Sequence, residues 1–295
     1  MTFDGGDAPR FAVGPVIATG LAVVSRDFFR LCGIVLAVGI PAVLLILLAG
    51  SMLASRAQGR GLGGSFQFSS HGDVVAFVAI LGVLSTVAYL LIQGAVTYGT
   101  LQTLRGQDAG GAAGVGACLG QAFAALPRLF LAALVLFLVG LVIAMAAGMM
   151  VGPLIRDNLA AGGGAAVNPA PVIAISLLSL AATLAILVLI WVFVPAIVVE
   201  RAGPIACFAR SLALTKGRRW TVFGIVLVVF VGNFIATAIT KLLMQSGAPL
   251  GGAVLNLLVA GFFMVLSGVL STIGYVRLRA EKEGFAVDDV GRVFD

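Results

Sequence analysis

The sequence contains little charge. Asp, Glu, Lys and Arg make up only 10% of its 295 residues, whereas 61% are hydrophobic. Soluble domains average about 25% charged and about 45–50% apolar residues. Eighteen Lys+Arg and 12 Asp+Glu therefore cannot cover a water-facing surface on a chain of this length. The composition excludes a soluble enzyme, a soluble nucleic-acid-binding protein and a secreted disulfide scaffold.

Residues that support catalysis or metal binding are also scarce. The single histidine, His71, excludes a metal site built on several imidazoles, and with Asp73 it makes no catalytic set. Cys32, Cys118 and Cys207 lie far apart in the chain and form no Cys-x-x-Cys pair, so we expect neither a zinc site nor a disulfide framework. We therefore expect no enzymatic activity, no metal and no cofactor.

Long uncharged stretches dominate the sequence instead. Six of them are long enough to cross a hydrocarbon core of about 30 Å, which takes about 20 residues. They predict an all-α fold, a polytopic bundle of six transmembrane helices. After trimming at proline and glycine signals, the spans are 31–50, 74–98, 129–151, 171–199, 221–244 and 251–276. Gly152-Pro153 is expected to end the third span, and Pro195 lies near the end of the fourth.

Basic residues are distributed unevenly between the two sides of such a bundle. Most of the 18 Lys+Arg fall on the side that holds both termini. The exceptions are Arg56, Arg60, Arg156 and Lys241. The positive-inside rule therefore predicts that residues 1–30 and the tail at 277–295 are cytoplasmic. No cleavable signal peptide is expected, because charged residues surround only a short apolar run in the first thirty residues.

Three connections on the basic side share one pattern, a short semi-polar helix that is followed by a basic residue and a span. Ala117–Ala124 reads Ala-Cys-Leu-Gly-Gln-Ala-Phe-Ala, and Ala206–Ala213 reads Ala-Cys-Phe-Ala-Arg-Ser-Leu-Ala. We expect interfacial helices at 111–126 and 203–215, and a third within 1–30. The chain would then be three copies of an interfacial helix plus a transmembrane hairpin. The alternative is that any helix flanking a membrane has such a composition.

The helix expected at 203–215 has two distinct faces. Ile205, Phe208 and Leu212 share one face, which suits a helix lying in the membrane interface. Cys207 and Leu214 lie on the opposite side, which indicates that the helix also packs against protein.

The segment from Pro195 to Phe223 resembles the signature of the membrane domain found in some bacterial glycerophosphoryl diester phosphodiesterases and in the related YciC-like proteins. The matching residues are Glu200, Gly203, Arg210, Ser211, Leu214, Thr215, Lys216 and Gly217. This resemblance implies a membrane-domain architecture in a bacterial cytoplasmic (inner) membrane. It implies no enzymatic activity, because the separate catalytic barrel of the phosphodiesterases, with its histidines and metal-binding carboxylates, has no counterpart in this sequence.

Polar residues near and inside the spans supply the candidate site. Glu200 is the only acid in a connection with five basic residues, and we expect it to pair with Arg210 or Lys216 and hold the interfacial helix against the preceding span. The remaining cations are candidate contacts for anionic lipid headgroups. They are Arg201, Arg218 and Arg219. Polar groups inside the spans are expected to form interhelical hydrogen bonds, with a substrate path as the alternative. They are Gln93, Asn233 and Asn256.

Together these features favour a non-enzymatic integral membrane protein that acts in membrane or envelope lipid organisation, or as an accessory to another membrane protein. The alternative is a transporter or channel for a lipid-like or apolar small solute, although the spans lack the buried carboxylates of ion-coupled transporters. The expected partners are membrane lipids, with anionic headgroups on the cytoplasmic side, and no nucleic acid. A homo-oligomer and a membrane-protein partner both remain open.

Overall fold

The computed structural model describes residues 11–57, 71–104, 114–160, 170–201, 203–245 and 249–283. These ranges are almost entirely helical, and they contain six helices long and apolar enough to cross a membrane. The predicted all-α six-span bundle is therefore confirmed. The described helices are α1 (Val13–Arg26), α2 (Phe28–Ala57), α3 (His71–Leu104), α4 (Val115–Ala160), α5 (Ala170–Ile190), α6 (Phe193–Glu200), α7 (Ala206–Thr215), α8 (Arg219–Gln245) and α9 (Pro249–Glu283).

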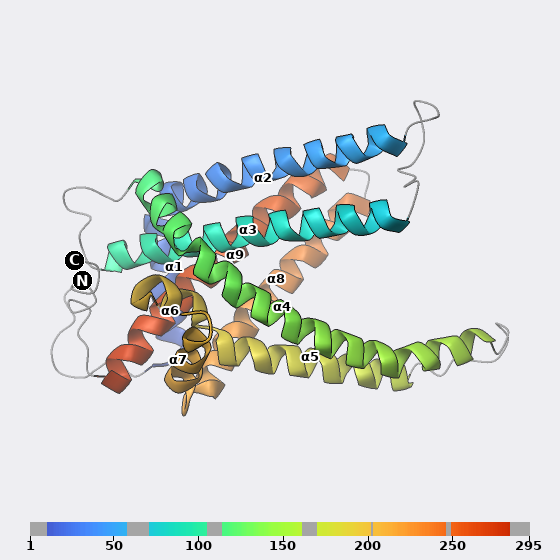
Figure 1. The fold of residues 1–295 in the computed structure, drawn as a ribbon. Coiled ribbons are helices and arrows are strands. Elements are labelled where there is room, and N and C mark those ends of the chain that lie inside the picture. The colour runs from blue at the N-terminus through green and yellow to red at the C-terminus, as the bar shows by residue number, and fades with distance from the viewer. Residues whose placement is uncertain are drawn as a thin grey trace.

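The short helices α1, α6 and α7 lie at one end of the long helices, where α9 also ends (Figure 1). Most of the basic residues whose side chains are described belong to these helices or to the adjoining ends of the spans. We call this end of the molecule the basic end. The hairpins α2–α3 and α8–α9 pack together, and α4 packs along α3.

The second interfacial helix and the third span are not separate helices. The sequence predicted a helix at 111–126 and a span at 129–151 that stops at Gly152-Pro153, and this division was wrong, because α4 runs unbroken through both segments. Residues 111–113 lie outside the described ranges. Pro127 and Pro153 are accommodated inside α4. In an apolar surrounding, ending a helix exposes several unpaired backbone groups, so continuing it past a proline is the less costly outcome.

The fourth span is interrupted, where the sequence predicted a single helix at 171–199. The chain leaves helical geometry at Trp191 and Val192, between α5 and α6. Pro195 explains the break, because its nitrogen has no hydrogen to donate to the carbonyl group of Trp191 four residues earlier. At this break the carbonyl oxygen of Leu189 accepts a hydrogen bond of 2.7 Å from the hydroxyl group of Ser211 on α7. The break therefore provides the attachment point of α7.

The ninth helix is longer than predicted. The sequence placed the end of the last span at 276 and a tail from 277, whereas α9 continues to Glu283. Its last two turns carry several charged residues, and a prediction based on hydropathy alone assigns such residues to a tail outside the span. These turns pack against α1 and α7 at the basic end.

Three helical segments at the basic end bury the same three positions. The segments are α1, the first turns of α4 (115–126) and α7. The buried residues are Val16, Gly20 and Val23 on α1, Cys118, Ala122 and Ala125 on α4, and Cys207, Ser211 and Leu214 on α7. The spacing of i, i+4 and i+7 places each set on one helical face. The burial pattern thus supports three copies of one unit.

The middle residue of each set is small because a neighbouring helix approaches closely there. A Cβ atom added at Gly20 would lie 2.5 Å from Leu270 on α9. Ala122 lies 3.3 Å from the position that a Cβ atom would take on Gly94 of α3. Ser211 contacts α5 through the hydrogen bond described above. Each segment therefore packs against the second span of a different copy. Residues 115–126 of the second copy pack on α3 of the first, α7 of the third copy packs on α5 of the second, and α1 of the first copy packs on α9 of the third. The three contacts close a ring.

Candidate functional site

Three helices bring five polar side chains together at the basic end. Tyr275, Arg279 and Glu283 are spaced four residues apart near the end of α9, so they lie on one face of that helix. Glu200 is the last residue of α6, and Arg210 lies in the middle of α7. We call these five residues the polar network.

Arg210 joins the end of α6 to the end of α9. Its Nε atom lies 2.9 Å and 3.0 Å from the two carboxylate oxygens of Glu200, and its Nη2 atom lies 2.5 Å from Oε1 of Glu283. Burial acts to lower the pKa of the Arg210 guanidinium, but the two carboxylates outweigh it and the pKa is raised. Arg210 is therefore charged at any physiological pH.

The carboxylate of Glu200 has two further partners on α9. The hydroxyl group of Tyr275, which is fully buried, donates a hydrogen bond of 2.5 Å to Oε1 of Glu200. The Nη1 atom of Arg279 lies 3.9 Å from the same oxygen and donates to the Tyr275 hydroxyl at 3.3 Å. The Nε atom of Arg279 lies 3.0 Å from Glu283. Two carboxylates thus face two guanidinium groups, so the polar network is neutral overall. Such balance is required of largely buried charges.

The structure brings together one of the two pairs expected from the sequence. Glu200 contacts Arg210, as described. Lys216 is exposed instead, and its backbone carbonyl oxygen accepts a hydrogen bond of 2.7 Å from Nζ of Lys282. The same ammonium group donates to the carbonyl oxygen of Ala213, so Lys282 caps the C-terminal end of α7.

The three α9 members of the polar network were missed by the sequence analysis. Tyr275, Arg279 and Glu283 fall at or beyond the predicted end of the last span, where charged residues were assigned to the tail. Their spacing of four residues was the available signal, because it places a phenol, a guanidinium and a carboxylate on one helical face.

The three proposed headgroup contacts occupy different surroundings. Arg218 forms an ion pair with Glu281 on α9, with its Nε atom 2.9 Å from the carboxylate. Arg201 adopts a left-handed backbone conformation with φ of 51° as α6 ends, and it is exposed. Arg219 is exposed at the start of α8, next to Trp220, whose side chain is 85% exposed. Arg218 thus has a structural partner, whereas Arg201 and Arg219 are open to the surroundings.

A second polar cluster, which the sequence analysis did not identify, ties the start of α2 to the end of α3. The Nη2 atom of Arg30 lies 2.5 Å from the carboxylate of Asp27, 3.0 Å from the carbonyl oxygen of Gly99 and 2.5 Å from the hydroxyl oxygen of Thr103. The hydroxyl group of Thr103 in turn donates to Asp27. Both ends of the first hairpin are therefore fixed at the basic end.

Two of the three polar residues inside the spans form contacts between helices. The Nε2 atom of Gln93 on α3 donates to the carbonyl oxygen of Met264 on α9 at 3.0 Å. Asn256 on α9 accepts a hydrogen bond of 3.2 Å from the Thr240 hydroxyl on α8. Asn233 is half-buried on α8, and its side chain makes no hydrogen bond within the described part of the chain. Gln93 and Asn256 thus act as structural contacts.

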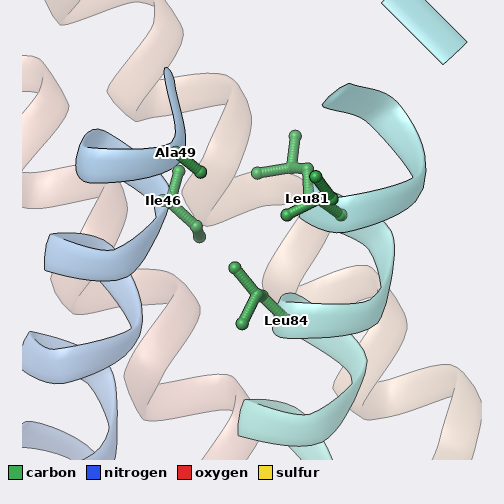
Figure 2. A pocket seen from close by; sticks show the side chains of 5 residues that line it. Ile46, Ala49, Leu81 and Leu84 are labelled. Carbon is green, nitrogen blue, oxygen red and sulfur yellow. The ribbon is translucent and has the colours of Figure 1, made fainter. Parts of the chain in front are cut away.

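A small apolar depression lies between α2 and α3, away from the basic end. Its lining residues are Ile46, Ala49, Ile80, Leu81 and Leu84, and the space between them is too small to enclose a water molecule. Figure 2 shows the side chains of the two helices pointing toward one another across this space. The lining is aliphatic, so the depression offers no group to orient a polar substrate. Among the described residues, no cluster of His, Cys, Asp or Glu could hold a metal ion.

Comparisons with family models, curated proteins and solved structures found no match.

Proposed function

We propose that the protein is a non-enzymatic, multi-pass protein of a bacterial inner membrane that binds anionic lipids of the cytoplasmic leaflet and takes part in lipid organisation. In this proposal the basic end, with both termini, faces the cytoplasm. The observation that supports it is the set of exposed cations at that end which take part in no ion pair among the described residues. Arg201, Lys216 and Arg219 are three of these cations.

Exposed aromatic side chains lie at the same end of the molecule as these cations. Phe29 begins the first span and is 88% exposed, and Trp220 begins the fifth span and is 85% exposed. Aromatic residues are typical of the boundary between headgroups and acyl chains. Each basic residue near an anionic leaflet contributes about 1 kcal/mol of attraction. Arg219 and Trp220 together therefore suit a negatively charged lipid interface.

A transporter of a lipid-like or apolar solute is the second candidate. The interrupted span α5–α6 favours it, because discontinuous helices line the binding sites of many transporters. The break lies near the basic end, however, and Ser211 occupies it. No Asp, Glu, Lys or Arg occurs between Asn158 and Val199, so the residues leading up to the break offer no group for ion coupling.

Lipid retention tests the proposal. The protein would be purified from membranes that contain phosphatidylethanolamine and phosphatidylglycerol, and the retained lipids would be quantified by native mass spectrometry. Arg219→Gln should lower the retained phosphatidylglycerol relative to phosphatidylethanolamine, and combining it with Arg201→Gln and Lys216→Gln should lower it further. Lys241→Gln, which removes an exposed cation at the opposite end of α8, is the matched control and should leave the ratio unchanged.

The opposite results would contradict the proposal. If the triple variant retains as much phosphatidylglycerol as the wild type, these three cations contribute only to topology. If Lys241→Gln lowers retention as much as Arg219→Gln, the attraction is not specific to the basic end.

A further inference from the structure

The outward faces of the three equivalent segments are apolar at matching positions. One large apolar side chain is exposed on each: Leu21 (46%), Phe123 (57%) and Leu212 (39%). The next residue is an exposed alanine in all three, and the residue three positions earlier is an exposed alanine or glycine. These residues are Ala22, Ala124 and Ala213, and Ala18, Gly120 and Ala209. At 100° per residue they lie opposite the buried face.

The two flanks between the buried and the outward faces differ from each other. One flank carries a half-buried large apolar residue in every copy. These are Ile17, Leu119 and Phe208. The other flank carries a polar residue in every copy. These are Thr19, Gln121 and Arg210. A helix with one polar edge and apolar surface elsewhere suits an orientation in the plane of the membrane interface.

The outward face of each segment is followed along the chain by a further exposed apolar side chain on the adjoining span. Eight residues beyond the exposed Leu21, Phe123 and Leu212, the chain again exposes a large apolar side chain in each copy. These are Phe29, Leu131 and Trp220. The last three belong to helices that are long and apolar enough to span the membrane. Each copy therefore exposes large apolar side chains both on the short segment and on the adjoining span, with an exposed basic residue between them in the chain.

We propose that α1, residues 115–126 and α7 form a collar that lies within the lipid of the leaflet at the basic end, with Leu21, Phe123 and Leu212 in contact with acyl chains. This inference rests on the proposed function, because it places the basic end at a lipid surface, and it adds the residues that enter the lipid. Each segment packs on protein through one face and on lipid through the other.

A transmembrane helix of another protein is the competing occupant of the same faces. Small residues spaced four apart, such as Ala18 and Ala22, allow helices to approach closely. The exposed Leu21 stands beside this stripe and would hold a second backbone away, and the same holds at the equivalent positions of the other two segments. Acyl chains, which adapt to an uneven surface, fit these faces better than a rigid helix.

Site-directed spin labelling tests the collar. Leu21→Cys, Phe123→Cys and Leu212→Cys would each be placed in a Cys32→Ser background, because Cys118 and Cys207 are buried. The labelled proteins would be reconstituted in phosphatidylcholine vesicles, and the collision rates of the label with oxygen and with a water-soluble nickel chelate would be compared. Lys216→Cys, at the exposed and charged end of α7, is the control.

We expect the oxygen-to-nickel collision ratio to be several-fold higher at the three collar positions than at the control. A ratio equal to that of the control would place the labels in water and overturn the proposal. Labels that are immobile and reached by neither reagent would also overturn it, in favour of a protein partner. Neutral vesicles keep the two proposals distinguishable, because the collar needs only acyl chains, whereas the headgroup contacts need anionic lipid.

Discussion

The substitution Glu200→Gln removes the negative charge from the side chain that contacts Arg210, Tyr275 and Arg279 in the polar network. In Glu200→Gln, Arg210 and Arg279 are left with a single carboxylate, Glu283, so one positive charge loses its partner in a site where the charged side chains are between 10% and 29% exposed. Breaking a fully buried pair costs about 3–5 kcal/mol and an exposed pair less than about 1 kcal/mol. Because this site is partly open, we expect a loss of about 1–3 kcal/mol in the free energy of unfolding.

The same structure supplies a matched control. Glu281 pairs with Arg218 at the same end of the molecule, but these side chains are more exposed, at 29% and 38%. Glu281→Gln should therefore cost less than about 1 kcal/mol. Thermal unfolding of detergent-solubilised protein, followed by circular dichroism, compares the two variants directly.

A double-mutant cycle then isolates the contact itself. Glu200→Gln and Arg210→Gln should deviate from additivity by at least about 0.5 kcal/mol, because the two side chains share hydrogen bonds. Additive effects would refute the reasoning. Equal destabilisation by Glu200→Gln and Glu281→Gln would refute it as well, since burial would then make no difference.

Three further expectations concern packing and reactivity. Burial raises the pKa of the Cys207 thiol to about 11. A maleimide should therefore leave this thiol unmodified at neutral pH until the protein unfolds, as measured by mass spectrometry. Modification of the folded protein at the rate of a free cysteine would contradict this expectation. Gly274→Ala should lower thermal stability by about 1–3 kcal/mol because the added Cβ would overlap the Trp191 ring, whereas Gly251→Ala, with open space around it, should not. Ser211→Ala should cost about 1–2 kcal/mol, because the carbonyl oxygen of Leu189 loses its donor at the α5–α6 break; an unchanged melting temperature would show that this hydrogen bond does not hold α7.

The six spans were predictable because each depends on local composition alone. A run of about 20 uncharged residues has few alternatives to a membrane-spanning helix. The break before α6 and the continuity of α4 were not predictable in the same way. Pro195 interrupts a helix and Pro127 does not, and what differs is the surroundings: near the first, Ser211 of α7 donates a hydrogen bond to the carbonyl oxygen of Leu189 at the break.

The polar network, too, could be predicted only in part from the sequence. The pairing of Glu200 with Arg210 could be anticipated, because one acid lies close in sequence to an excess of cations. The contribution of Tyr275 could not, since it depends on a helix 75 residues further along the chain reaching the end of α6. Contacts across such separations are set by the packing of the hairpins, which hydropathy does not describe.

The proposed function depends on the basic end facing the cytoplasm, and cysteine labelling of intact cells tests this most directly. A membrane-impermeant maleimide applied from outside should modify a cysteine introduced between residues 57 and 70 and should leave one introduced between 284 and 294 unmodified until the membrane is permeabilised. Labelling of the second position in intact cells, with protection of the first, would contradict the account.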